Sequence, residues 1–169
     1  SDMWALDLND TAEWESTGSG PNSIGTNTFA SDGIASGLMV GQSHTGEPTM
    51  WSWNGYSTSW TPYSEGVRPP GMSSQAMVWD SGSQRYISYG GQEADSGNYT
   101  NETWAFNPGN AVWQNLSAVN SPRGISDPAM FFSEGWNRTI LFGGYDSGKN
   151  LSNETWMFNG ETNTWSKLS

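Results

Sequence analysis

The side chains best suited to chemistry are carboxylates in two segments rich in glycine and asparagine. Glu93 and Asp95 lie in the first segment, and Asp146 lies one repeat later in the second. Carboxylate oxygens are preferred ligands of calcium, so these three residues could bind that ion. Neither segment has the dense alternation of Asp and Asn that is typical of calcium loops. We therefore interpret the three carboxylates as solvated loop groups and predict no metal site.

A second candidate is His44 with Glu47, a pair that could bind a metal or transfer a proton. The chain has a single His, which cannot build a multi-histidine site, so we favour a role outside catalysis. Four tyrosines could stack on sugar rings, namely Tyr56, Tyr63, Tyr99 and Tyr145. The alternative, which we favour, is that these tyrosines are ordinary loop anchors.

Several enzyme classes are disfavoured by residues that the chain lacks. It has no cysteine, which removes disulfides, thiolate nucleophiles and most structural zinc sites. No Gly-X-Ser-X-Gly motif is present, and no helical pattern follows the glycine pairs to hold a phosphate group. We therefore predict a chain without catalytic activity and without a cofactor.

The charge of the chain limits its partners. The net charge is −11, and only six residues are basic. A phosphate backbone and an anionic membrane surface would both be repelled, so neither is an expected partner. The longest apolar runs are short segments such as residues 129–132, far short of the roughly 18 residues that a membrane span needs. We predict a protein partner or self-assembly, with glycan as the alternative, and no transmembrane segment.

Seven Asn-X-Ser/Thr triplets favour passage through the secretory pathway, because such triplets accept N-linked glycans. They begin at Asn9, Asn98, Asn101, Asn115, Asn137, Asn150 and Asn153. The absence of cysteine, taken alone, would favour an intracellular protein. Seven triplets are more than we expect by chance, so we predict a secreted or cell-surface glycoprotein with glycans on loops and strand ends.

The elements that must position these side chains are set by an internal repeat. Residues 101–107 read Asn-Glu-Thr-Trp-Ala-Phe-Asn, and residues 153–159 differ from them only by a Met in the fifth place. Each copy closes on a second tryptophan, Trp113 or Trp165, and two looser copies lie upstream. The first tryptophans of the four copies are 47, 53 and 52 residues apart. A period near 50 residues is typical of stacked β-units.

The complete units each predict four short strands. In the best preserved unit, strands are expected at 75–79 and 85–91, then around Trp104 and Trp113, with turns rich in Asn, Asp, Pro and Gly between them. No long run has helical periodicity. The many aromatic residues suit pleated surfaces, and the 21 glycines suit tight turns.

This pattern resembles the kelch repeat, in which a glycine pair ends the second strand and tryptophans lie in the last two. The residues that carry the resemblance are Gly90, Gly91, Gly143, Gly144, Trp104, Trp113, Trp156 and Trp165. At 40–42 the second glycine is replaced by Gln, so that repeat is degenerate. Glycine allows close approach of backbones, and large indoles fill the wedge between stacked sheets, so we predict structural roles for all eight residues.

The resemblance implies an all-β fold, a kelch-type β-propeller built from four-stranded blades. About three and a half blades are present, so we predict a part of a larger propeller. Residues 1–17 would form the second half of one blade, followed by a degenerate blade at 18–65 and blades at 66–118 and 119–169. Within the wider superfamily, galactose-oxidase-like copper enzymes need a Cys linked to a Tyr and several His ligands, which this chain lacks.

Strand alternation places the loops between strands two and three, and those between strand four and the next blade, on one face. Variable loops on a rigid scaffold commonly carry binding. The candidates on this face are His44, Glu47, Tyr63, Glu93, Asp95, Tyr99, Tyr145 and Asp146. We predict a non-catalytic scaffold that binds protein or assembles through these loops. The alternatives are the propeller of a carbohydrate-active enzyme and a glycan-binding module.

Overall fold

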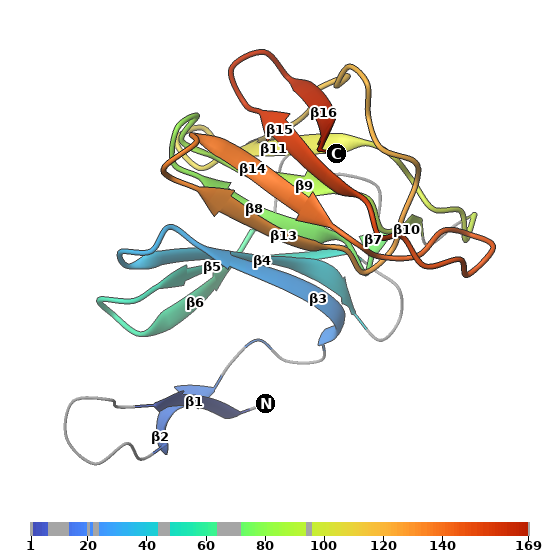
Figure 1. The fold of residues 1–169 in the computed structure, drawn as a ribbon. Coiled ribbons are helices and arrows are strands. Elements are labelled where there is room, and N and C mark those ends of the chain that lie inside the picture. The colour runs from blue at the N-terminus through green and yellow to red at the C-terminus, as the bar shows by residue number, and fades with distance from the viewer. Residues whose placement is uncertain are drawn as a thin grey trace.

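The structure is a computed structural model that describes residues 2–6, 14–19, 21, 24–43, 48–63, 72–93 and 96–168. Every regular element in these ranges is a β-strand, which confirms the predicted all-β class (Figure 1). No helix in the described part of the chain has the length and apolar character needed to cross a bilayer.

Three four-stranded antiparallel sheets follow one another along the chain, and we call them the first, second and third blade. The first blade holds β3 (Ile24–Ser31), β4 (Ser36–Ser43), β5 (Pro48–Asn54) and β6 (Ser59–Pro62). The second holds β8 (Ala76–Asp80), β9 (Arg85–Tyr89), β11 (Thr103–Asn107) and β12 (Val112–Asn115). The third holds β13 (Ala129–Ser133), β14 (Arg138–Phe142), β15 (Thr155–Asn159) and β16 (Thr164–Leu168). These sheets confirm the expected blades of a partial β-propeller.

Two smaller sheets complete the described part. Strands β1 (Asp2–Leu6) and β2 (Trp14–Ser19) pair in antiparallel fashion, and β2 extends two residues beyond the 1–17 range expected for half a blade. We call the first strand of each blade, β3, β8 or β13, its inner strand. Strand β7 (Met72–Ser73) pairs with β10 (Gln92–Glu93) at the end of the second blade where β8 begins.

The hairpin turns are fixed by Asp and Asn side chains that accept hydrogen bonds from nearby backbone amides, as short polar side chains commonly do in turns. Asp32 Oδ1 accepts from the amides of Ile34, Ala35 and Ser36 at 2.9–3.0 Å. Burial opposes ionisation of Asp32, but these donors outweigh it and lower the pKa of the carboxyl group. The second blade repeats the device at Asp80, whose Oδ1 accepts from an amide at 2.9 Å.

The blades stack with their inner strands side by side, because β8 contacts β3 on one side and β13 on the other (Figure 1). Each stacking interface buries one apolar core. The core between the first and second blades holds Ala30, Leu38, Val40, Met50, Met77, Tyr86, Phe106 and Trp113. The core between the second and third blades holds Ile87, Tyr89, Ala105, Leu116, Ile125, Leu141, Phe158 and Trp165. No blade can bury both of its faces alone, so the stack is the unit of stability.

The two tryptophans of each repeat lie in different surroundings. Trp113 and Trp165 are 2% and 1% exposed, and each reaches across to the preceding blade. Trp165 Nε1 donates to Thr103 Oγ1 at 2.9 Å, and Trp113 Nε1 lies 3.0 Å from the sulfur of Met50. These indoles fill the wedge between the blades.

Trp104 and Trp156, the first tryptophans of their repeats, are half-buried. Each indole N–H donates to the glutamate two residues earlier in the Glu-Thr-Trp motif. The acceptors are Oε2 of Glu102 at 2.7 Å and Oε2 of Glu154 at 2.9 Å. The repeated motif therefore closes a local hydrogen bond at the start of the third strand of each blade.

Candidate functional site

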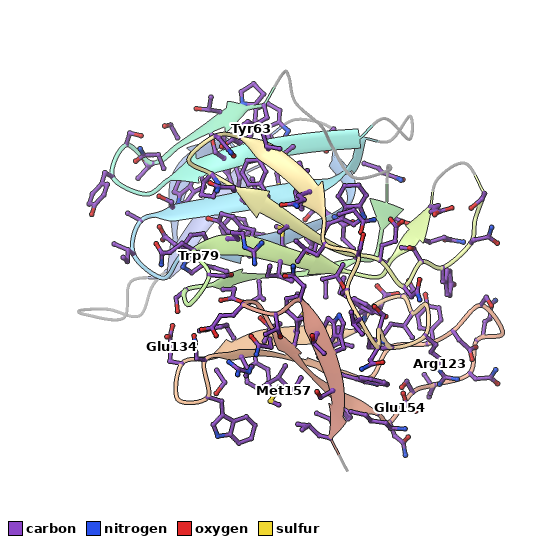
Figure 2. The ribbon with its side chains drawn as sticks, turned by 90° about the horizontal axis from the view of Figure 1, so that it is seen from above. Tyr63, Trp79, Arg123, Glu134, Glu154 and Met157 are labelled. Atoms are coloured by element: carbon purple, nitrogen blue, oxygen red, sulfur yellow. The ribbon has the colours of Figure 1, made fainter. Side chains whose placement is uncertain are left out.

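The two ends of the blades differ in their connections. The 81–84 and 134–137 turns lie at one end, and the longer segments that follow β9 and β14 lie at the other. Figure 2 shows Glu134 at the first end and Arg123 and Glu154 at the second. We call these ends the turn face and the loop face.

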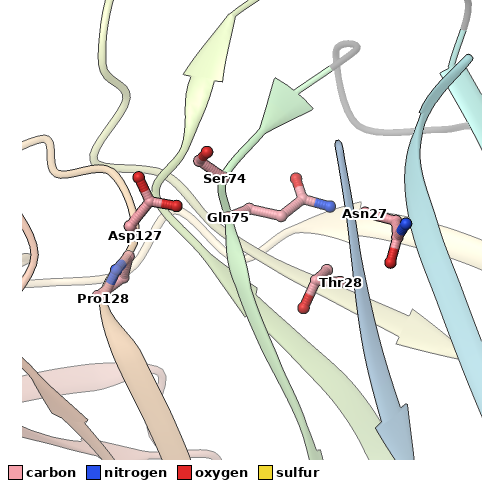
Figure 3. A pocket seen from close by; sticks show the side chains of 6 residues that line it. All are labelled: Asn27, Thr28, Ser74, Gln75, Asp127 and Pro128. Carbon is pink, nitrogen blue, oxygen red and sulfur yellow. The ribbon is translucent and has the colours of Figure 1, made fainter. Parts of the chain in front are cut away.

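A pocket of about 330 Å³ opens where the three inner strands begin, at the loop face (Figure 3). Each blade contributes two of the lining residues. They are Asn27 and Thr28 from β3, Ser74 and Gln75 before β8, and Asp127 and Pro128 before β13. The lining is mostly polar, with two amides, two hydroxyls and one carboxylate, and Pro128 is its one apolar residue.

The approach to the inner strands has an unusual backbone. Ser74 and Asp127 have positive φ values of 59° and 51°, a region that residues other than glycine seldom enter. The amide of Asp127 donates to the carbonyl of Ser74 at 2.8 Å, which ties the two approaches together. Both segments also lie close against the glycine pairs. A Cβ on Gly91 would lie 2.8 Å from the Ser73 carbonyl oxygen, and a Cβ on Gly144 would lie 2.7 Å from the Ser126 carbonyl oxygen. The pocket is thus built on backbone that neighbouring blades hold in place.

Gln75 is the most unusual residue of the pocket. Its side chain is 6% exposed, and Figure 3 shows it reaching across the pocket between Ser74 and Asn27. Neither Oε1 nor Nε2 has a hydrogen-bond partner in the described part of the chain. A buried polar group without a partner costs about 1–3 kcal/mol, so this amide weakens the folded state that contains it.

Asp127 is held by hydroxyl groups of neighbouring residues. Ser126 Oγ donates to Asp127 Oδ2 at 3.3 Å, and the Tyr145 hydroxyl also hydrogen-bonds to this carboxylate. The hydrogen bond to Asp127 raises the pKa of Tyr145, because it stabilises the protonated phenol. The backbone of Tyr145 pairs with that of Ser126 at 2.9 and 3.0 Å, and its ring packs edge-on against Tyr99.

We expect Asp127→Asn to lower the pKa of Tyr145 towards its ordinary value of about 10. The carboxylate supplies both the accepting oxygen and the nearby negative charge that raise this pKa. NMR titration of tyrosine labelled at Cζ would follow the change, with Tyr145→Phe to assign the signal. Asp146→Asn is the matched control, because it removes the negative charge of the residue that directly follows Tyr145. Equal shifts in the two variants would contradict the assignment.

The structure separates the carboxylates that were considered as calcium ligands. Glu93 accepts a hydrogen bond from Ser96 Oγ at 2.6 Å, whereas Asp146 pairs with Arg123 at 3.1 Å. Backbone and side-chain hydrogen bonds from Asn150 are among the causes that lower the pKa of Asp146. In the described part of the chain, no three His, Cys, Asp or Glu side chains are grouped so that they could hold a metal ion. His44, Glu47 and Asp95 lie outside the described residues.

The four tyrosines do not form one surface. Tyr99 and Tyr145 meet on the loop face with their ring centroids 5.7 Å apart. Tyr63 is half-buried and packs edge-on against Phe106 in the core between the first and second blades. Tyr56 is 85% exposed in the turn between β5 and β6, on the turn face. Tyr63 is therefore placed as a core residue rather than as a group on the binding face.

The glycosylation candidates lie on both faces. Among the described ones, the side chains of five are exposed, namely Asn98, Asn101, Asn137, Asn150 and Asn153. Asn115 is half-buried, and its Oδ1 accepts from the amide of Ser117 at 2.9 Å. Asn9 lies outside the described residues.

Sequence reasoning missed Gln75 and Asp127, the residues that give the pocket its character. A signal was available for these two, because polar residues stand directly before the inner strands of the second and third blades. Gln75 lies one residue before β8 and Asp127 two residues before β13, whereas Asn27 lies within β3.

The comparisons with known proteins agree with this architecture. The KLHDC2/KLHL20/DRC7 Kelch-repeats domain, as a family model, matches residues 29–169, from β3 to the end of the third blade. Among the curated proteins, none matches the chain.

Proposed function

Because the chain belongs to the kelch-repeat family, whose repeats suggest a protein-interaction scaffold, we propose that it binds a protein partner, or assembles, through the loop face. The observation that carries the proposal is the pocket at this face, to which each of the three blades contributes two residues. Asp and Asn side chains accept hydrogen bonds from local backbone amides at both faces, as Asp80 does at the turn face and Asp146 does at the loop face. What distinguishes the loop face is the pocket, where the amide of Gln75 has no hydrogen-bond partner among the described residues.

We propose further that the scaffold is non-catalytic. General acid or base chemistry needs a titratable side chain, such as a carboxylate or His, that is available to a substrate. Three carboxylates of the loop face are engaged within the fold, since Glu102 accepts from Trp104, Glu154 pairs with Lys167 at 2.6 Å, and Asp146 pairs with Arg123. The glycan-binding alternative has less support, because only two of the four tyrosines meet and they pack edge-on against each other.

The scaffold proposal is tested by affinity capture with the protein as bait. We expect Asp127→Lys to reduce capture of a specific partner at least ten-fold, because it reverses the charge of the pocket. Glu134→Lys is the matched control, since it makes the same charge change at an exposed residue of the turn face. If both variants lose the partner equally, or neither does, binding does not occur at the loop face.

We also propose that the protein is a secreted or cell-surface glycoprotein. The supporting observation is that four glycosylation candidates of the loop face are exposed, namely Asn98, Asn101, Asn150 and Asn153. We expect the intact mass of the native protein to fall by several glycan masses after enzymatic removal of N-linked glycans. Mass spectrometry before and after treatment measures this. An unchanged mass would overturn the secretory assignment and leave the scaffold proposal intact.

A further inference from the structure

The pocket at the loop face has the properties of a built site. Gln75 is 94% buried and carries an amide donor and an amide acceptor without partners in the described residues. Its neighbour Ser74 and the facing Asp127 both have positive φ values. Strained backbone and unpaired buried polar groups each destabilise a fold, and they persist where the surrounding structure enforces them. Both features therefore occur together in this pocket.

The charge of the pocket selects a cation. Asp127 is its one carboxylate, and none of the six described lining residues is basic. Two basic groups elsewhere on the loop face are paired with carboxylates, Arg123 with Asp146 at 3.1 Å and Lys167 with Glu154 at 2.6 Å. A third, Lys149, lies in the segment after β14 and is not among the lining residues. The whole chain carries a net charge of −11. Such a field raises the local concentration of cations and repels anions.

The size of the pocket selects a side chain with a short stretch of backbone. A volume of about 330 Å³ lies at the lower end of the range of about 300–1,000 Å³ that is usual for ligand pockets. The lining amides and hydroxyls of Asn27, Thr28, Ser74 and Gln75 offer both donors and acceptors, which a peptide backbone requires. A basic side chain on an extended peptide satisfies the size, the charge and the hydrogen-bonding groups together.

We propose that this pocket binds an arginine or lysine side chain of an extended peptide segment of the protein partner. Asp127 pairs with the cation, and Gln75 makes the hydrogen bonds to the adjoining peptide group that it lacks in the free protein. The inference rests on the proposed function, because it names the chemistry by which the loop face recognises its partner. It also explains why the buried amide of Gln75 has no hydrogen-bond partner among the described residues, because the partner peptide supplies one.

The probe for the test is the tripeptide acetyl-Gly-Arg-Gly-amide, titrated into the ¹⁵N-labelled protein. Its matched control is the same peptide with citrulline, which keeps the shape of arginine and removes its charge. We expect the arginine peptide to bind with a Kd on the order of 1 mM, as a single small contact allows, and to shift the side-chain amide signals of Gln75. We expect the citrulline peptide to bind at least ten-fold more weakly.

Two variants assign the contacts. Asp127→Asn should weaken binding of the arginine peptide at least ten-fold and leave binding of the citrulline peptide unchanged. Gln75→Met should weaken both peptides and raise the melting temperature of the free protein, because it removes an unpaired buried amide. Glu134→Gln, on the turn face, should change neither affinity. A Gln75→Met protein that binds normally, or melts at a lower temperature, would overturn the role of Gln75.

The outcomes separate this inference from the function on which it rests. Equal binding of the arginine and citrulline peptides, or no binding of either, overturns the recognition of a basic segment. If affinity capture still depends on Asp127, the loop face remains a partner site of different chemistry. If capture is insensitive to Asp127 as well, both the inference and the scaffold proposal fail.

Discussion

Alanine in place of Gly144 should cost about 3 kcal/mol or more of folding free energy, whereas the same change at Gly143 should cost about 1–2 kcal/mol. The two glycines are adjacent and have similar positive φ values, 83° and 74°. They differ in what a Cβ would meet. At Gly144 it would lie 2.7 Å from the Ser126 carbonyl oxygen and 3.2 Å from the backbone nitrogen of Pro128, whereas at Gly143 the nearest atom is 3.7 Å away. Backbone atoms cannot yield as a flexible side chain does.

Urea denaturation followed by tryptophan fluorescence would measure both variants, with Gly33→Ala as a further control. Gly33 has a φ of 77°, and a Cβ added there would meet no neighbouring atom within 4 Å, so this variant reports the backbone strain alone. We expect Gly33→Ala and Gly143→Ala to agree within about 1 kcal/mol. Equal losses of folding free energy in Gly143→Ala and Gly144→Ala would show that close packing against the backbone before β13 is not the reason why glycine is required at Gly144.

The fold could be predicted from the sequence because the same pattern of strands and turns recurs in each repeat, with the same strand pairing. Trp104 pairs with Ser88, and Trp156 pairs with Leu141, so the third strand meets the second in the same register in two blades. The Asn and Asp residues that marked the turns also hold them, as at Asp32 and Asn159. Patterns of this kind are local, and local patterns survive in a single sequence.

The pocket could not be predicted in the same way, because its residues come from three blades. Asn27, Gln75 and Asp127 are far apart in the chain and become neighbours only when the inner strands stack. The glycines and tryptophans dominate the repeat signal, and they report how blades pack rather than what the pocket exposes. That Gln75 lacks partners among the described residues is a property of its surroundings, which no motif records.

Tyr63 illustrates how strand pairing decides the place of a side chain. Its position after the fourth strand of the first blade predicted a loop residue. In the structure its amide donates to the Met50 carbonyl at 2.9 Å, so the pairing with β5 extends beyond the end of β6. The ring then packs on Phe106, and burial raises the pKa of its hydroxyl group. One additional hydrogen bond thus separates a core residue from a surface residue.

Trp165→Ala should have an equally large effect, with a loss of about 3–5 kcal/mol of folding free energy. The indole is 1% exposed and packs against Tyr89 and Phe158, with ring centroids 5.0 and 4.9 Å away. Its removal would leave a cavity in the core between the second and third blades. Trp136→Ala is the control, since that indole is 64% exposed and its loss should change stability by no more than about 0.5 kcal/mol.

The hydrogen bond of Trp165 can be separated from its packing with Thr103→Val. This change leaves the indole in place and removes the oxygen that accepts from Nε1 at 2.9 Å. An unpaired buried N–H costs about 1–3 kcal/mol, so we expect a smaller loss than for Trp165→Ala. Equilibrium denaturation would rank the three variants. If Thr103→Val were as damaging as Trp165→Ala, the blades would be joined chiefly by this hydrogen bond. The expected order instead makes the buried ring the main link between the second and third blades.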